Sequence, residues 1–411
     1  MKKFNKDKYL KKLKFKKYKR YLYIGISCIL VLLIGIYFAY SKFSVFKEEE
    51  VVRTTVGEFI SGDAVIGAYV DGEYSKTIPG KNDGYVVEKI VCDNDATASW
   101  DSDAWGVVLT NLTKRTKCNV YFETKRTPLT EVITTAMNSN PSMFATDDSG
   151  KNVRYIGANP RNYVYFNCSD YNHPTSYTCE LWRIIGVFNN ITKADGSKEN
   201  LVKIIRDESI GDIAWDSNNV NDWSTATLQQ NLNSGMYYTT TLKNDTTRNA
   251  IEEVVWNLGG IDGWFNSASK GLASHFYGYE RGTTVYTGRP TIWTGKIGLM
   301  YPSDYGYATS GGTTKDRAAC LAKELSKWDL SAFSDCKGND YLFDANEIQW
   351  TLAPLSDSAY NVFRVYTQGL VDSLPANITY AVRPVLYLKS NIQVDKGIGV
   401  KYDPYRLKLT S

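Results

Sequence analysis

A stretch of twenty residues without a charged side chain, Tyr21–Tyr40, constrains this chain more than any other feature. At 1.5 Å per residue, an α-helix of this length spans about 30 Å, the thickness of the hydrocarbon core of a bilayer. The twenty residues before it carry ten Lys and one Arg against a single acid, Asp7, and basic clusters stay on the cytoplasmic side of a membrane. The sequence therefore predicts a cytoplasmic tail (1–20), one transmembrane helix (21–41) surrounded by membrane lipid, and extracellular domains after it.

Two other interpretations of the N-terminal region stay open. A cleaved signal peptide ends in small residues, as Ala39-Tyr40-Ser41 does, but its apolar core is normally about 7–15 residues long. Lysine clusters also bind polyanions such as nucleic acid. A lysine cluster directly before an apolar span is better explained by membrane topology and anionic lipid, so no nucleic-acid partner is expected.

Six cysteines follow the span, and an even number outside a membrane is typical of disulfides. Fifteen pairings of six cysteines exist, and we favour the local one because each pair brackets a short segment. The chain has neither the C-x-x-C spacing nor the histidines that a zinc site uses, so no metal is expected there. The predicted disulfides join Cys92 to Cys118, Cys168 to Cys179 and Cys320 to Cys336.

A stalk (42–60) and a small all-β sandwich (61–125) are expected after the span. Short alternating runs in the second segment are separated by turn-forming pairs such as Asp71-Gly72, which is typical of short strands. Four acids of this segment are close enough in sequence for a calcium loop, but they lack a known loop spacing, and acids in turns are common. These acids are Asp93, Asp95, Asp101 and Asp103.

The rest of the chain, 126–411, is expected to form one α+β head rich in aromatic and small polar residues. Apolar, β-branched runs predict strands, and 3.6-residue periodicity predicts helices. The predicted strands are 163–168, 180–188, 201–207, 292–300, 345–353, 362–367 and 382–388. The predicted helices are 225–234, 246–256 and 315–325, besides one that starts at Pro128.

Several of these segments resemble a known family. The head resembles the C-type-lectin-like folds related to the formylglycine-generating enzyme, in which a W-x-L segment and a terminal G-V-R-P-A-L-like strand bracket an exposed loop region. The chain also resembles membrane-anchored surface proteins of low-GC Gram-positive gut bacteria, which share the run Trp293–Gly306. The segments that carry these resemblances are Glu180–Val187, Leu201–Arg206, Trp223, Leu232-Asn233, Trp350–Pro354, Ala381–Leu388 and Trp293–Gly306.

The bracketed region, 356–380, is the predicted ligand-binding surface. It combines tyrosine with small polar residues, a composition that recognition loops use because tyrosine buries much area while fixing few torsions. Part of the region also alternates like an ordinary half-buried strand pair, so this alternative stays open. The candidate ligand-binding residues are Asp357, Tyr360, Asn361, Arg364, Tyr366, Gln368, Asp372 and Asn377.

No catalytic motif accompanies these features. Formylglycine-type oxidation uses reactive cysteines near the C-terminus, and no cysteine follows Cys336. The only two histidines, His173 and His275, lack the sequence context of a nucleophile–base pair. We therefore expect no enzyme, no cofactor and no catalytic residue.

The first functional hypothesis is a membrane-anchored surface protein of the binding or adhesion type, with a glycan, a protein or a wall polymer as its extracellular ligand. An extracellular hydrolase acting on carbohydrate or peptidoglycan is the second, since acids are plentiful and two suitably spaced carboxylates suffice for glycoside hydrolysis. A structural scaffold protein of the envelope is the third.

Overall fold

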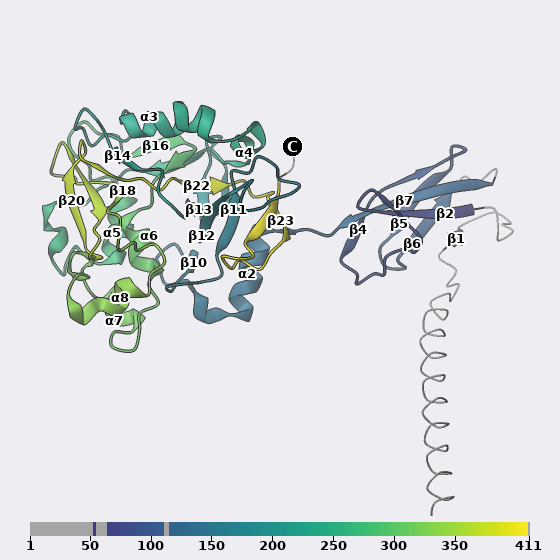
Figure 1. Ribbon diagram of the computed structural model, residues 1–411, viewed down its shortest axis with the longest axis horizontal. Coiled ribbons are helices and arrows are strands. Elements are labelled where there is room, and N and C mark those ends of the chain that lie inside the picture. The colour runs from purple at the N-terminus through teal and green to yellow at the C-terminus, as the bar shows by residue number, and fades with distance from the viewer. Residues whose placement is uncertain (1–51, 55–63, 111–114, 410–411) are drawn as a thin grey trace, which may run out of the picture. The chain divides into compact units, whose positions relative to one another are not determined.

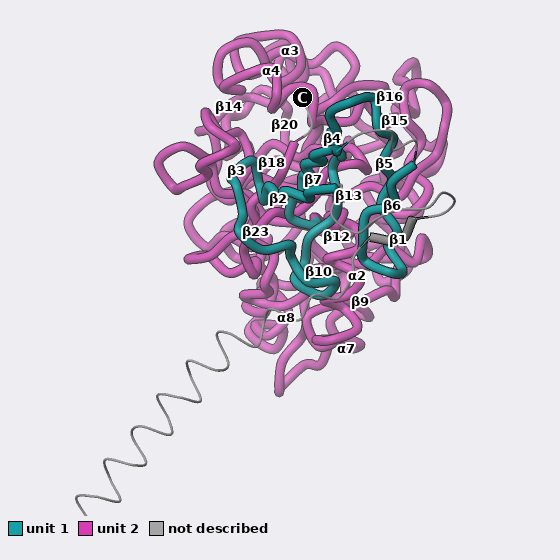
Figure 2. The backbone as a smooth tube through the Cα atoms, turned by 90° about the vertical axis from the view of Figure 1, so that its right-hand side faces the viewer, with its two compact units in different colours: residues 1–125 teal, residues 126–411 magenta. Residues whose placement is uncertain are grey.

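The computed structural model describes residues 52–54, 64–110 and 115–409, and the chain divides into two compact units between Lys125 and Arg126 (Figure 2). Each unit has its own hydrophobic core. We call the part up to Lys125 unit 1 and the part from Arg126 onward unit 2.

Unit 1 consists of two sheets that share one core. The larger sheet has the order β3-β2-β7-β4, and the smaller has the order β1-β6-β5. Trp100 and Trp105 pack edge-on against each other within this core, with ring centroids 5.2 Å apart. The strands are β1 (Val52–Thr54), β2 (Ala64–Val70), β3 (Glu73–Ser75), β4 (Tyr85–Cys92), β5 (Thr97–Asp101), β6 (Gly106–Thr110) and β7 (Thr116–Thr124).

Unit 2 is built around a large mixed sheet with the order β17-β22-β13-β12-β11-β24-β23-β8, to which β10 and β9 add beside β12 (Figure 1). A second sheet has the order β14-β21-β18-β19-β20, and β15 and β16 form a separate pair. The strands are β8 (Thr127–Pro128), β9 (Phe144–Ala145), β10 (Val153–Tyr155), β11 (Tyr163–Phe166), β12 (Glu180–Thr192), β13 (Lys198–Arg206), β14 (Asp212–Ala214), β15 (Val254–Asn257), β16 (Ile292–Gly295), β17 (Ile297–Gly298), β18 (Gln349–Pro354), β19 (Asn361–Val365), β20 (Val371–Pro375), β21 (Thr379–Ala381), β22 (Val385–Leu388), β23 (Gln393–Lys396) and β24 (Tyr405–Lys408).

The helices of unit 2 are short and cover parts of these sheets. The longest, α2, packs against β12, β13 and β23, while α3 packs against β14 and β17. The helices are α2 (Leu129–Ser139), α3 (Thr227–Asn233), α4 (Asp245–Ala250), α5 (Ala273–Glu280), α6 (Pro302–Ala308), α7 (Arg317–Leu321) and α8 (Ser334–Gly338). Single turns are η1 (Pro141–Met143), η2 (Tyr237–Thr241), η3 (Gly263–Asn266), η4 (Leu325–Lys327) and η5 (Ser331–Phe333).

The two ends of unit 2 meet in its large sheet. The last strand, β24, pairs in parallel with β11, and β23 pairs with β8 at the beginning of the unit. The strands β24 and β23 therefore fill the gap between β11 and β8 in the large sheet.

The predicted α+β class is wrong, because unit 2 is mostly sheet and its helices are single or few turns. One predicted helix shows the physical reason. Of the expected helix 246–256, only residues 246–250 are helical, as part of α4 (Asp245–Ala250), and residues 254–256 belong to β15 (Val254–Asn257). Val254, Val255 and Trp256 are β-branched or aromatic, and they favour a strand once β16 is available as a partner.

The predicted membrane location, with a cytoplasmic N-terminus and extracellular domains, is not supported. Within residues 52–54, 64–110 and 115–409, no helix combines the length and the apolar character needed to cross a bilayer. The expected tail (1–20) and span (21–41) lie outside the described residues, and of the expected stalk (42–60) only Val52–Thr54 is described. These three residues form β1, which pairs in parallel with β6 of unit 1.

Candidate functional site

The three predicted disulfides are present, so that prediction is confirmed. In unit 1 the disulfide links directly paired positions of β4 and β7, and in unit 2 one of the two disulfides links α7 to α8. The bonds are Cys92–Cys118, Cys168–Cys179 and Cys320–Cys336.

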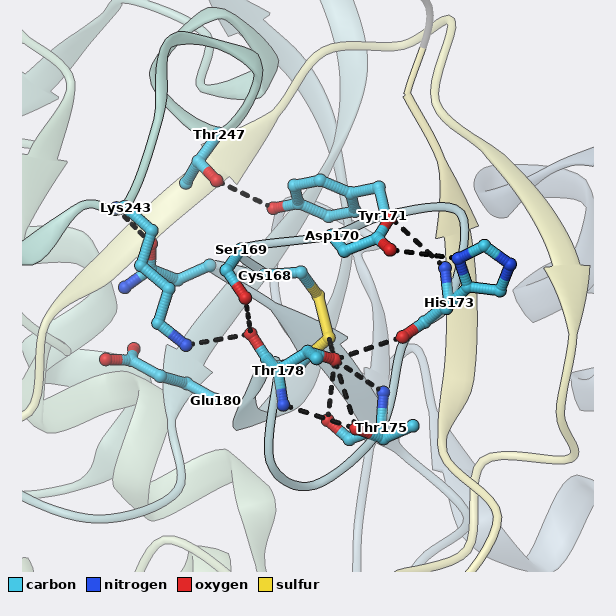
Figure 3. Close-up of a disulfide and its surroundings, with 12 residues drawn as sticks. Cys168, Ser169, Asp170, Tyr171, His173, Thr175, Thr178, Glu180, Lys243 and Thr247 are labelled. Carbon is cyan, nitrogen blue, oxygen red and sulfur yellow. Dashed lines mark hydrogen bonds and ion pairs between the residues drawn. A yellow bond between two sulfur atoms is a disulfide. The ribbon is translucent and has the colours of Figure 1, made fainter.

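The Cys168–Cys179 disulfide closes an exposed loop that also holds one of the two histidines (Figure 3). His173 Nδ1 lies 2.9 Å from Asp170 Oδ2, and the histidine side chain is 84% exposed. Lys243 Nζ donates a hydrogen bond to the carbonyl oxygen of Thr178 at 2.8 Å. These contacts stabilise the conformation of a surface loop, and the His173–Asp170 pair is one of them.

Two of the four acids proposed for a calcium loop accept hydrogen bonds from the backbone. Asp93 Oδ1 accepts the backbone N–H of Lys117 at 2.7 Å. Asp101 Oδ1 accepts those of Asp103 and Ala104, each at 2.9 Å. The two Asp101 contacts are typical of an acid that stabilises a turn, whereas the Asp93 contact links two segments that are 24 residues apart in the sequence.

The eight predicted ligand-binding residues lie on one hairpin, β19–β20, and its flanking turns, but they do not form one patch. Asp357 and Tyr360 precede β19, whereas Tyr366 and Gln368 lie at the turn where the hairpin reverses. The five residues of β19 separate these two groups by about 17 Å, at about 3.4 Å per residue. Asp357, Tyr360, Gln368 and Asn377 are exposed; Asn361, Tyr366 and Asp372 are half-buried; Arg364 is buried.

Arg364 has a structural role in this hairpin. Its Nε and Nη2 atoms form a two-pronged contact with Asp372, at 2.7 and 3.1 Å. The rings of Tyr366 and Tyr380 lie 5.0 and 4.6 Å from its guanidinium carbon. Because β19 lies between β18 and β20, the arginine is only 6% exposed, and its donors hold the hairpin together.

A different part of unit 2 contains a cavity of about 270 Å³. It lies where the end of β12, the strand β15, the end of α5, the start of α6 and the strand β22 converge. Its volume is close to the lower end of small-molecule pockets, about 300–1,000 Å³, and its mixture of aromatic rings and amides is typical of them. We call this the β12–α5 cavity; its lining residues are Asn152, Phe188–Thr192, Val255–Asn257, Tyr277, Arg281, Tyr301 and Tyr387.

A buried ion cluster lies directly behind the aromatic wall of the cavity. Lys203, on β13, is fully buried and contacts Asp304 at the start of α6. Arg154 contacts the same carboxylate at 2.9 Å and Asp148 at 2.5 Å. Burial acts to raise the pKa of Asp304, but the nearby Lys203 and Arg154 charges lower it below its usual value, so this carboxylate is ionised. Two cations and two carboxylates therefore balance each other.

The cluster also fixes the rings that line the cavity. Lys203 Nζ lies 4.5 Å from the ring centroid of Tyr301, and at 5.1 to 5.7 Å from three further lining rings. The attraction between a cation and the face of an aromatic ring is stronger when both groups are desolvated, so these contacts restrain the orientation of the rings. The other three rings are Phe188, Trp256 and Tyr387.

A second ion pair lies at the side of the cavity. Glu280 is buried and accepts hydrogen bonds from Ser303 through both oxygens, one from the backbone N–H at 2.9 Å and one from the hydroxyl. Arg281 Nη1 lies 3.0 Å from Glu280 and 3.1 Å from the carbonyl oxygen of Tyr277. Burial raises the pKa of Glu280, although the Arg281 charge and the Ser303 contacts act to lower it.

Several lining side chains keep hydrogen-bonding atoms without a protein partner in the described part of unit 2, and two of them, Arg281 and Tyr387, border the aromatic wall. Within residues 115–409, nothing accepts a hydrogen bond from Nε or Nη2 of Arg281, and the Tyr387 hydroxyl also has no partner. By contrast, the Tyr301 hydroxyl donates to the Asn257 carbonyl at 3.0 Å and accepts its N–H at 3.1 Å. The cavity thus offers a ligand the cationic donor edge of Arg281, the hydroxyl groups of Tyr387 and Thr192, and the side-chain amides of Asn190 and Asn257.

None of the cavity residues was among the predicted ligand-binding residues, although the sequence carried a signal for them. Tyr301 belongs to the run Trp293–Gly306, and Tyr387 belongs to Ala381–Leu388. Both segments were singled out because they resemble segments of known proteins, and the structure brings them together at this cavity. Arg281 had no such signal.

The chain was compared with protein-family models, curated proteins and solved structures, and none of them matches it.

Proposed function

We propose that unit 2 is a ligand-binding domain and that its binding site is the β12–α5 cavity. The observation that carries the proposal is a cavity of about 270 Å³ whose rings are fixed by a buried ion cluster while Arg281 and Tyr387 retain unpaired polar atoms. A rigid wall with a few free polar groups is the usual construction of a small-molecule site. Of the ligand classes expected from the sequence, a sugar-sized group at the end of a glycan or wall polymer fits this volume best.

The three disulfides support action in an oxidising compartment, where such bonds persist. Binding is favoured over hydrolysis because the two buried carboxylates nearest the cavity have other partners. Asp304 is held by Lys203 and Arg154, and Glu280 by Ser303 and Arg281. A glycosidase needs one carboxylate as acid and another as base or nucleophile, both facing the substrate, and neither of these two lines the cavity.

The proposal is tested by screening the intact protein against a glycan and wall-fragment library, with binding measured by calorimetry. Thr192→Trp places a large ring in the cavity, while Leu330→Trp adds the same ring at a position that is 45% exposed and does not line it. Binding that survives in the second variant and disappears in the first supports the cavity. Equal binding by both variants would rule the cavity out as the site.

The hairpin surface predicted from the sequence is tested in the same screen. Changing four of its members to Ala, two from each end of the hairpin, alters that surface and leaves the cavity intact. Loss of binding in this variant alone would move the site to the β19–β20 hairpin. The four residues are Tyr360, Asn361, Tyr366 and Gln368.

A further inference from the structure

We propose that the ligand group which enters the β12–α5 cavity bears a carboxylate, as an acidic sugar does, and that Arg281 binds it through Nε and Nη2. This inference rests on the proposed function and deepens it by naming the chemical class of the ligand.

The Arg281 guanidinium has one edge that a carboxylate can bind. Its plane lies over the ring of Tyr277, with 3.5 Å between the guanidinium carbon and the ring centroid. Nη1 is used by the Tyr277 carbonyl and by Glu280. The two nitrogens that stay unpaired share one edge of the group, and this edge matches the two oxygens of a carboxylate in a two-pronged hydrogen bond.

The charges around the cavity leave Arg281 as the cation available to a ligand. Lys203 and Arg154 are balanced by Asp304 and Asp148 behind the wall, so neither cation adds a net charge to the cavity. Among the described residues, Arg281 has only Glu280 as a counter-ion, and Ser303 already takes a hydrogen-bonding position on each oxygen of that carboxylate.

A hydroxylated ring suits the rest of the cavity. The Tyr387 hydroxyl can donate to or accept from a sugar hydroxyl. Trp256 lines the same cavity, and amphipathic aromatic side chains offer an apolar face beside a polar tip. A carboxylate at Arg281 and hydroxyl groups toward Tyr387 are therefore the features expected of the ligand.

The test compares D-glucuronate, D-glucose and inorganic phosphate on the intact protein by calorimetry. We expect glucuronate to bind at least about tenfold more tightly than glucose, because a hydrogen-bonded charge pair contributes that much or more. Arg281→Gln should remove this preference, and Arg281→Lys should retain only part of it, since Lys has no two-pronged edge. Arg161→Gln, the same change at an exposed position of unit 2, should leave it intact.

A variant that keeps the arginine guards against simple misfolding. Tyr387→Phe removes only a hydroxyl that has no protein partner, so the fold should persist while binding of glucuronate and of glucose weakens by the same factor. Equal binding of glucuronate and glucose by the wild-type protein would overturn the carboxylate assignment, as would phosphate that binds as tightly as glucuronate. If the library screen finds a cavity ligand without an acidic group, the proposed function stands and this inference fails. If no ligand of the cavity is found at all, both fail.

Discussion

Among the single side-chain groups of unit 2, we expect the Asp304 carboxylate to be the one whose replacement lowers the stability of the fold most. It lies between Lys203 and Arg154, and the side chains of all three are at most 2% exposed. It also accepts the backbone N–H of Tyr301 at 3.0 Å, at the beginning of α6. Replacing Asp304 by Asn keeps the shape but removes the charge, which leaves a fully buried ammonium without a counter-ion.

The size of the effect follows from this burial. Removing one partner of a buried ion pair typically costs about 3–5 kcal/mol, because the remaining charge stays desolvated and unpaired. We expect Asp304→Asn to lower the free energy of unfolding by about this amount. Asp212→Asn, an identical change at an exposed position of β14, should change it by less than about 0.5 kcal/mol.

A double-mutant cycle identifies the cause. Lys203→Met removes the ammonium and leaves a flexible apolar side chain among the same aromatic rings. If the cost of Asp304→Asn comes from the unpaired ammonium, the double variant should be more stable than the sum of the single effects predicts, by about 1 kcal/mol or more. Urea unfolding of the four proteins, followed by near-ultraviolet circular dichroism, measures this difference, and additive effects would refute the reasoning.

The pH dependence provides a further check on the same residue. The pKa of Asp304 is lower in the folded protein than the value of about 3.9 in an unfolded chain. The folded state therefore binds fewer protons at this position, and its contribution to stability is present above pH 4 and is lost as the pH falls toward the folded pKa. The free energy of unfolding of Asp304→Asn should therefore fall less steeply with decreasing pH than that of the wild-type protein. Equal slopes for the two proteins at acid pH would contradict this.

Three further predictions concern other parts of unit 2. Gly186→Ala should cost more than about 2 kcal/mol, because its Cβ would lie 2.1 Å from a carbonyl oxygen of β10, whereas Gly278→Ala has nothing within 4 Å and should be neutral or stabilising in a thermal melt. Replacing both Cys320 and Cys336 by Ser should lower stability by about 3 kcal/mol, the value for a loop of this length; in urea unfolding, reductant should destabilise the wild-type protein more than this variant, which keeps the other two disulfides, and an equal response would contradict the prediction. Asn244→Ala should cost about 1 kcal/mol by calorimetry, since its side chain accepts a backbone N–H at the beginning of α4; an unchanged melting temperature would show that this cap is dispensable.

The features that could be predicted from the sequence are local ones. The disulfides could be predicted because each pair brackets a short segment, as Cys168 and Cys179 do with a sequence separation of 11. The strands β12, β13 and β22 overlap predicted segments because apolar residues are concentrated in them, as expected for strands buried on both faces. The lengths of the helices were harder to predict, since the pairing of β15 with β16 overrode the helical periodicity of 246–256.

The candidate site could not be assembled in the same way. Phe188, Arg281 and Tyr387 come from distant parts of the chain, and only the order of strands in the large sheet brings two of them together. Side-chain composition pointed instead to the β19–β20 hairpin. There Arg364 looked like a surface residue, and its burial depends on β18 and β20 lying on either side of it, which no local pattern reveals.

The pairing of β8 with β23 and of β11 with β24 determines the order in which unit 2 can assemble. The strands made first have an incomplete sheet until β23 and β24 have left the ribosome, because these two strands fill the place between β11 and β8. The local disulfides are not subject to this delay, since Cys168–Cys179 and Cys320–Cys336 each close within one short segment. Oxidation can therefore precede completion of the sheet, and a chain shortened before Gln393 would carry correct disulfides on a sheet with two open edges.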